Sequence, residues 1–151
     1  MKPHNARGVS KLGVSVLAVS LLTLCGIAAA AGNSTEPVYN PSTEVRLSAV
    51  ITGVRQVSEG SPMAGVHLTV QSKTGTADVY LAPSDFLKLL KTNFKVGAQV
   101  QVIGSQVQGA ASEVILAREV TEGDTSITLR EFTGVPVWQH WGVVADVNVG
   151  G

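Results

Sequence analysis

Apolar and polar residues alternate twice between residues 66 and 84, on either side of a glycine-containing turn. The apolar positions are Val66, Leu68, Val70, Ala77, Val79 and Leu81. A period of two is typical of half-buried strands. Gly75 ends the connecting stretch Ser72-Lys73-Thr74-Gly75, where a left-handed position favours glycine. The pattern therefore predicts a hairpin in which Gln71 faces Thr76.

This register predicts which side chains share a face of the hairpin. Counting back from the turn pairs Val70 with Ala77, Thr69 with Asp78, Leu68 with Val79, His67 with Tyr80 and Val66 with Leu81. The apolar pairs lie on one face, and a slip of one residue would exchange the faces. The other face carries His67, Thr69, Asp78 and Tyr80, which we take as candidate ligand-binding residues.

Similar patterns predict four further elements. They are a long strand from Glu44 through Gly53 to Val57, a helix that starts at Pro83-Ser84-Asp85, and strands over 97–104 and 113–120. Gly53 inside a strand indicates a bulge or bend. Proline and an acidic residue suit the first turn of a helix. The apolar side of the helix is expected to hold Phe86, Leu87, Leu89, Leu90 and Phe94.

The order of elements is three strands, one helix and two strands. Together with the bent first strand and the Gly-x-x-Val-x-Val-x-Gly pattern of 97–104, this order resembles the OB-fold, a five-stranded Greek-key barrel. The expected fold class is thus mainly β, an OB-fold-like barrel with one short helix between strands 3 and 4 and a C-terminal extension. The resemblance implies that ligands meet the face of the second and third strands.

The C-terminal part adds a second resemblance. Leu129-Arg130 followed by Gly134-x-Pro136-x-Trp138 resembles a group of small exported bacterial OB-fold proteins, largely uncharacterised, some of them called nucleic-acid-binding because of the fold. We interpret Trp138 as a plug that packs on the barrel; the alternative is that Trp138 and Trp141 contact a partner. Arg118 and Arg130 are expected to pair with Glu119 or Glu131. Residues 143–149 alternate again and suggest an edge strand.

The first 31 residues have the pattern of a secretory signal peptide. Lys2, Arg7 and Lys11 precede an apolar run that ends in four alanines. The alternatives are a retained membrane anchor and a lipoprotein with Cys25 as its lipidation site. We predict cleavage, a periplasmic or secreted protein and no stable membrane insertion afterwards. The predicted organisation is a signal peptide over 1–31, a flexible lead-in over 32–43, the barrel over 44–122 and the extension over 123–151.

Cleavage changes the charge and the chemistry of the chain. Three basic residues and no acidic ones lie in the leader, so eight basic and eleven acidic residues remain, a net charge of −3. An acidic domain is a poor partner for phosphate backbones. The only cysteine is also removed, which excludes a disulfide or a thiolate site.

No catalytic motif occurs in the chain, and we expect a protein that is no enzyme and has no cofactor. The leading hypothesis is an envelope accessory protein that binds a partner protein, a peptide or a small polar ligand. Binding of single-stranded nucleic acid, with Tyr80 stacking on a base, is the alternative. A second alternative is a metal held by His67, His140 and Asp78, although the histidines are expected at the surface without a metal. The oligomeric state is open.

Overall fold

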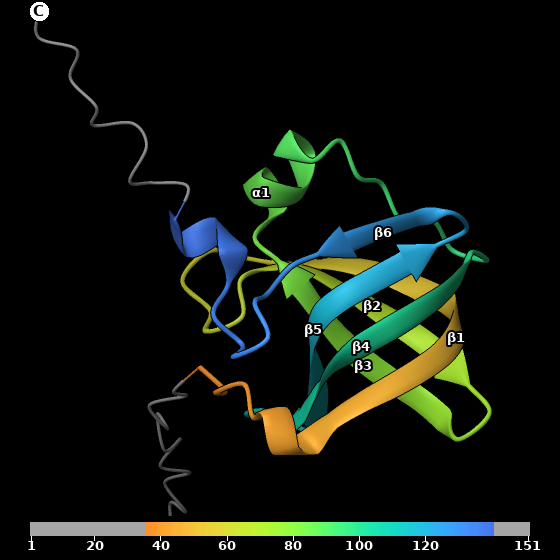
Figure 1. Cartoon of the computed structure of the whole chain (residues 1–151), viewed down its shortest axis with the longest axis horizontal. Helices are drawn as coiled ribbons and strands as arrows, with labels where there is room; N and C mark the ends of the chain where they lie inside the picture. Colours follow the sequence, from red (N-terminus) through yellow and green to blue (C-terminus); the bar gives the residue numbers. More distant parts are fainter. Residues whose placement is uncertain (1–35, 141–151) are drawn as a thin grey trace, which may run out of the picture. The chain divides into compact units, whose positions relative to one another are not determined.

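The computed structural model describes residues 36–140, and the predicted signal peptide, Trp141 and the expected strand over 143–149 lie outside them. Figure 1 shows a mainly β structure with one short α-helix. Its elements are η1 (Pro41–Thr43), β1 (Glu44–Val57), β2 (Gly65–Ser72), β3 (Gly75–Ala82), α1 (Ser84–Leu89), β4 (Gln99–Gln108), β5 (Glu113–Glu122), β6 (Thr125–Thr128) and η2 (Val137–His140). Among the described residues, no helix has the length and apolarity needed to cross a membrane.

The strands form one sheet that closes on itself. Their order is β3-β2-β1-β4-β5-β6, and parallel pairing of β3 with β5 at Val79 and Tyr80 closes the first five into a barrel. β6 extends the sheet beyond β5. The predicted mainly β fold class is confirmed: the chain forms a closed five-stranded barrel with one short helix between β3 and β4, and β6 adds a strand after the barrel.

β1 pairs with both β4 and β2, and it is irregular at Gly53. Its first half pairs with β4 and its second half pairs with β2, and the register of the β1–β2 pairing shifts between Ile51 and Gly53. A bulge of this kind increases twist and turns a strand around the corner of a barrel. The predicted strand from Glu44 to Val57 and the irregularity at Gly53 are both confirmed.

The β2–β3 hairpin has the predicted register over most of its length. Five predicted pairs occur, from Gln71 with Thr76 back to His67 with Tyr80. The predicted pairing of Val66 with Leu81 is wrong, because a register shift next to His67 places Val66 opposite Ala82. Gly75 has a φ of 130°, in the region that favours glycine.

The main core takes side chains from all five barrel strands. Its fully buried members include Ile51, Leu68, Leu81, Val102 and Val120. Burial of each such side chain contributes about 1.5–3 kcal/mol relative to exposure. The alternating apolar residues that predicted the strands therefore have their side chains in this core.

The helix α1 covers part of the core with Phe86 and Leu87. Leu89, which was expected on the same side, is 64% exposed. Successive helix positions advance by about 100°, so Leu89 lies roughly 110° from the centre of the stripe formed by Phe86, Leu87 and Leu90. The prediction for Leu89 is wrong for this geometric reason.

Candidate functional site

The four predicted site residues lie together in the hairpin but not on one exposed face. His67 pairs with Tyr80 and Thr69 pairs with Asp78 across β2 and β3. His67 is 2% exposed and Tyr80 is 3% exposed, whereas Thr69 and Asp78 are half-buried. The expectation of an outer polar surface is therefore wrong for His67 and Tyr80.

The connection between β1 and β2 covers these two residues. The Met63 carbonyl oxygen lies 2.9 Å from His67 Nε2, and the Tyr80 hydroxyl donates to the Ala64 carbonyl oxygen over 3.1 Å. A carbonyl oxygen can only accept, so Nε2 of His67 carries the proton in this contact. Alternation within a strand reports which side chains share a face, but it does not report whether a loop covers that face.

Asp78 connects the buried His67 to the surface. Its carboxylate accepts from Arg55 Nη2 at 2.6 Å and lies 3.2 Å from His67 Nδ1. Burial raises the pKa of Asp78, but the hydrogen bond and charge of His67 and the charge of Arg55 outweigh it and hold this pKa below its ordinary value. Arg55 is not among the predicted site residues: it lies opposite His67 in the β1–β2 pairing, which the alternation within the β2–β3 hairpin does not describe.

The ring of His67 has no nitrogen left for a metal in this arrangement. Nε2 donates to Met63, and Nδ1 faces the Asp78 carboxylate and, at 3.2 Å, Arg55 Nη2. Within residues 36–140 no three side chains of the metal-binding types are grouped. His140 is exposed on η2, as expected of a surface histidine, while the same expectation is wrong for His67.

Tyr80 is covered from the other side by the C-terminal extension. The guanidinium carbon of Arg130 lies 5.3 Å from the centre of the Tyr80 ring and 4.9 Å from that of Trp138. Trp138 also contacts the Phe86 ring, with 5.6 Å between centres. Trp138 thus packs on the barrel, in agreement with the plug interpretation, and Tyr80 has no free face for stacking on a base.

The predicted ion pair of Arg118 with Glu119 occurs, but the hydrogen bonds of Arg118 and Arg130 go to other groups. Among the described residues Arg130 bonds no carboxylate; its Nη1 donates to the backbone carbonyl oxygens of Leu81 and Ala117. Arg118 lies 4.0 Å from the predicted Glu119, but its hydrogen bonds go to Glu44, from Nε at 2.9 Å and from Nη2 at 3.1 Å. Glu44 is far away in the sequence, so no local pattern could identify it.

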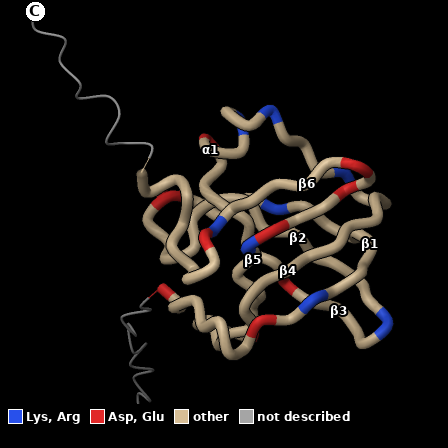
Figure 2. Tube along the Cα trace, viewed as in Figure 1, with Lys and Arg blue, Asp and Glu red and all other residues tan. Residues whose placement is uncertain are grey.

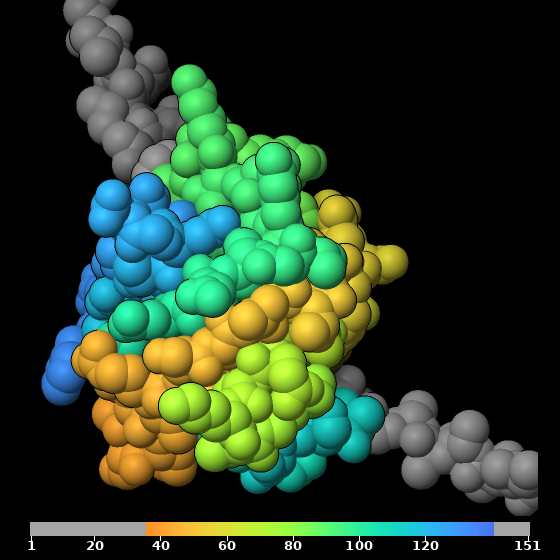
Figure 3. Space-filling model, turned by 90° about the vertical axis from the view of Figure 1, so that its right-hand side faces the viewer, coloured from red at the N-terminus to blue at the C-terminus, as the bar shows by residue number. Residues whose placement is uncertain are grey.

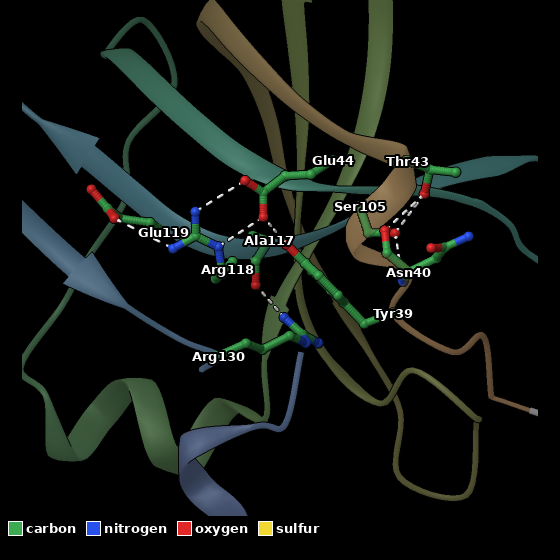
Figure 4. A network of polar contacts seen from close by, with 9 residues as sticks. All are labelled: Tyr39, Asn40, Thr43, Glu44, Ser105, Ala117, Arg118, Glu119 and Arg130. Atoms are coloured by element: carbon green, nitrogen blue, oxygen red, sulfur yellow. Dashed lines mark hydrogen bonds and ion pairs between the residues drawn. The ribbon is translucent and has the colours of Figure 1, made fainter. Parts of the chain in front are cut away.

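Figure 4 shows the network that Glu44 organises between the lead-in, β1 and β5. The Tyr39 hydroxyl donates to Glu44 over 2.5 Å. Hydrogen bonds from Arg118 and Tyr39 lower the pKa of Glu44, and burial together with Glu44 raises the pKa of Tyr39 to about 12. Tyr39 is 9% exposed, so packing against the barrel begins before Glu44, inside the segment expected to be a flexible lead-in.

Two depressions adjoin the hairpin. The first, which we call the hairpin groove, has a volume of about 870 Å³, and the residues lining it include Arg46, Leu47, Thr74, Ala77, Glu113 and Ile115. The second, the loop pocket, has a volume of about 200 Å³ and mainly apolar walls that include Val57, Pro62, Met63, Ala110, Ala111 and Val114. Asp78, Ser112 and Val114 line both, so the two depressions lie next to each other.

The hairpin groove runs along a strand edge. Among the described strands, β3 pairs with β5 at Val79 and Tyr80 alone, so residues 75–78 have a strand neighbour, β2, on one side only. An unpaired edge presents backbone N–H and C=O groups to an incoming chain. In Figure 3 the first part of β1 (orange) and the hairpin tip (yellow-green) lie side by side on the face turned to the viewer.

Comparison with known proteins gives a family. No curated protein matches the chain. The model of one family, described as the MamS/MamX magnetosome protein family, matches residues 43–127, which run from the end of η1 into β6 and leave Arg130 and Trp138 outside. This match includes the whole barrel, the hairpin and its site residues, and more than half of the sequence. The chain belongs to the MamS/MamX magnetosome protein family.

Proposed function

We propose that this protein is an exported, non-enzymatic accessory protein that binds an extended segment of another magnetosome protein along the hairpin groove. The observation that carries this proposal is the unpaired edge of β3 over residues 75–78, which faces a groove of about 870 Å³. Addition of a strand to an open sheet edge is a general mode of peptide recognition, in which backbone hydrogen bonds supply affinity.

The loop pocket would supply specificity. It adjoins the groove at Asp78, and its lining combines apolar side chains with the Arg55–Asp78 ion pair. A peptide that lies along β3 would place one side chain at this opening. An apolar side chain of moderate size suits the walls, and the ion pair at the rim favours polar neighbours on either side.

The cellular setting of the proposal rests on two observations. The leader pattern supports export, and the family description supports a partner among magnetosome proteins.

The site supports nucleic-acid and metal binding less well. Tyr80, the only aromatic residue among the four candidates, lies under Arg130 and Trp138. Figure 2 shows charges of both signs scattered over the described residues, with no continuous basic track in this view. Single-strand binders need both stacking platforms and a positive groove, and a metal would need ring nitrogens that His67 uses elsewhere.

The test is a binding screen with peptides that cover the magnetosome proteins of the same bacterium. We expect a subset to bind and to shift the backbone amides of residues 75–78 in NMR spectra. Thr76→Trp would fill the groove from an exposed position and should weaken binding at least tenfold. Thr128→Trp, on exposed β6 and outside both depressions, is the matched control and should bind normally.

Two results would contradict the proposal. Equal binding by the Thr76→Trp and Thr128→Trp variants would remove the hairpin groove as the site. Binding of single-stranded oligonucleotides that falls steeply with salt, together with the absence of any peptide ligand, would favour the nucleic-acid alternative.

A further inference from the structure

Arg130 is a buried cation without a buried anion. Its side chain is 3% exposed, and in the part of the chain that the structure describes no carboxylate lies within 4.0 Å of its nitrogens. A buried charge is costly unless a partner compensates it. The two aromatic rings of Tyr80 and Trp138 compensate it in part through cation–π contacts.

The hydrogen bonds of Arg130 leave one edge of its guanidinium unused. Both of its side-chain bonds start from Nη1 and go to the carbonyl oxygens of Leu81 and Ala117. Nε and Nη2 have no such partner among residues 36–140, and neither is a fully enclosed polar atom, since Ser84 Oγ is the one enclosed side-chain atom there that lacks a partner. These nitrogens therefore reach an open space.

That space is a small pocket beside the C-terminal extension, which we call the Arg130 pocket. It has a volume of about 260 Å³, and apart from Arg130 its lining includes Glu36, Val38, Leu116, Thr133, Pro136 and Gln139. The lining thus combines apolar side chains with one guanidinium, and Glu36, Thr133 and Gln139 are its further residues with polar side chains. Figure 4 shows Nη1 of Arg130 turned to Ala117 and the other guanidinium nitrogens turned away from it.

We propose that the Arg130 pocket binds the carboxylate group of a small organic acid or of a peptide C-terminus. The Nε and Nη2 groups of an arginine form the fork that holds a carboxylate through two parallel hydrogen bonds. The stack between Tyr80 and Trp138 fixes the plane of this fork before any ligand arrives. This site is separate from the hairpin groove and does not depend on the proposed function.

The charges of the pocket select a carboxylate over phosphate. Arg130 is the one basic residue that lines it, and Glu36 already places a negative charge there. The charges of Arg130 and Glu36 sum to zero, so a bound carboxylate leaves one excess negative charge in the pocket, whereas a phosphate dianion would leave two. Burial lowers the pKa of Arg130 to about 10, despite the opposing charges of Tyr80 and Glu36, and a bound anion would offset this effect.

The experiment is an NMR titration of the purified protein with sodium acetate at constant ionic strength, maintained with sodium chloride. We expect a saturable shift of the Arg130 Nε–H signal and of the Gly134 amide, and a weaker response to inorganic phosphate. A second titration compares a peptide that has a free C-terminus with the same peptide in amidated form, which distinguishes a peptide C-terminus from a small organic acid as the ligand. Binding of the free form alone assigns the pocket to chain ends, and binding of acetate alone assigns it to small acids.

Variants at exposed positions test the site without disturbing the buried arginine. Glu36→Gln removes the competing charge and should tighten acetate binding about twofold to fivefold. Gln139→Glu adds a negative charge to the pocket and should abolish the shift of the Arg130 Nε–H signal that acetate causes. The matched controls Glu131→Gln and Gln99→Glu make the same changes at exposed positions outside the pocket and should leave binding unchanged.

Three outcomes would overturn the proposal. An Arg130 signal that responds equally to acetate and chloride would mean that no carboxylate site exists. Tighter binding of phosphate than of acetate would refute the carboxylate assignment. Unchanged acetate binding in the Gln139→Glu variant, at an unfolding midpoint equal to that of the unmodified protein, would place the site elsewhere.

Discussion

The Asp78 carboxylate lies 3.2 Å from Nδ1 of the buried His67 and accepts a 2.6 Å hydrogen bond from Arg55. It thereby joins β1, β2 and β3 at the point where the hairpin groove meets the loop pocket. Removal of the carboxylate charge would leave His67 with a poorer partner in a site where it is 2% exposed. Unsatisfied buried groups of this kind cost more than the mean hydrogen bond.

Asp78→Asn should therefore destabilise the protein by about 1–3 kcal/mol at neutral pH. Urea unfolding followed by circular dichroism measures this change. Asp85→Asn is the matched control: Asp85 pairs with Lys88 at the surface, where both side chains are more than two-thirds exposed. Such pairs contribute little, so an equal loss in both variants would refute a special role for Asp78.

The acid dependence of the same variant follows from the sign of the pKa shift. The pKa of Asp78 is lowered in the folded protein from an ordinary value of 3.8. Its stabilising effect is thus complete above about pH 3.8 and is lost as the pH falls through the lower folded value. The difference in unfolding free energy between Asp78→Asn and the unmodified protein should narrow below pH 3.8. A difference that stays constant down to acid unfolding would contradict this assignment.

Both tyrosines of the chain should resist ionisation. Burial is the main cause that raises the pKa of Tyr39 and of Tyr80, each to about 12 from 10.0. A raised folded pKa gives a stabilising effect that is complete below pH 10 and is lost as the pH rises from 10 through the folded value of about 12. Absorbance at the tyrosinate band should stay flat through pH 10 in folded protein, and unfolded protein in denaturant should titrate near 10. A folded titration near pH 10 would mean that at least one tyrosine is exposed.

Gly134 should tolerate no side chain, because it lies against Tyr39. Its φ is 93°, and a Cβ added there would lie 2.5 Å from three carbon atoms of the Tyr39 side chain. Gly60 has a similar φ of 89° and open space around the same position. Gly60→Ala should lower the free energy of unfolding by roughly 1 kcal/mol through backbone strain alone. Gly134→Ala should lower it by about 1–3 kcal/mol more than Gly60→Ala does, because of the contact with Tyr39. Equal losses in thermal or urea unfolding would show that the contact with Tyr39 yields easily.

Ser105 should hold the lead-in against the barrel. It is fully buried on β4; its Oγ accepts from the Asn40 backbone N–H at 3.0 Å and lies 2.9 Å from Thr43 Oγ1. Ser105→Ala leaves the Asn40 donor without this acceptor and should cost about 1–3 kcal/mol. It should also speed hydrogen exchange at Asn40 and Thr43. Ser126→Ala removes an exposed hydroxyl of β6 and is the control. It should change neither the free energy of unfolding nor the hydrogen exchange at Asn40 and Thr43.

The sequence by itself determined the parts of the fold that depend on near neighbours. Alternation and a turn glycine specified the β2–β3 register up to His67, and Gly53 marked the bend of β1. These features are local, because strand period and glycine conformation act over a few residues. The same reasoning brought Asp78 and His67 together, since both lie in one hairpin.

Only the tertiary structure decided which of these residues meet solvent and which charges pair. A loop covers His67, and a C-terminal arginine and tryptophan cover Tyr80. Arg118 forms its hydrogen bonds with Glu44, which is 74 positions away in the chain, while the adjacent Glu119 is only a distant ion-pair partner. Burial and ion pairing depend on segments that folding brings together from a distance, and a single sequence carries no periodic signal for them.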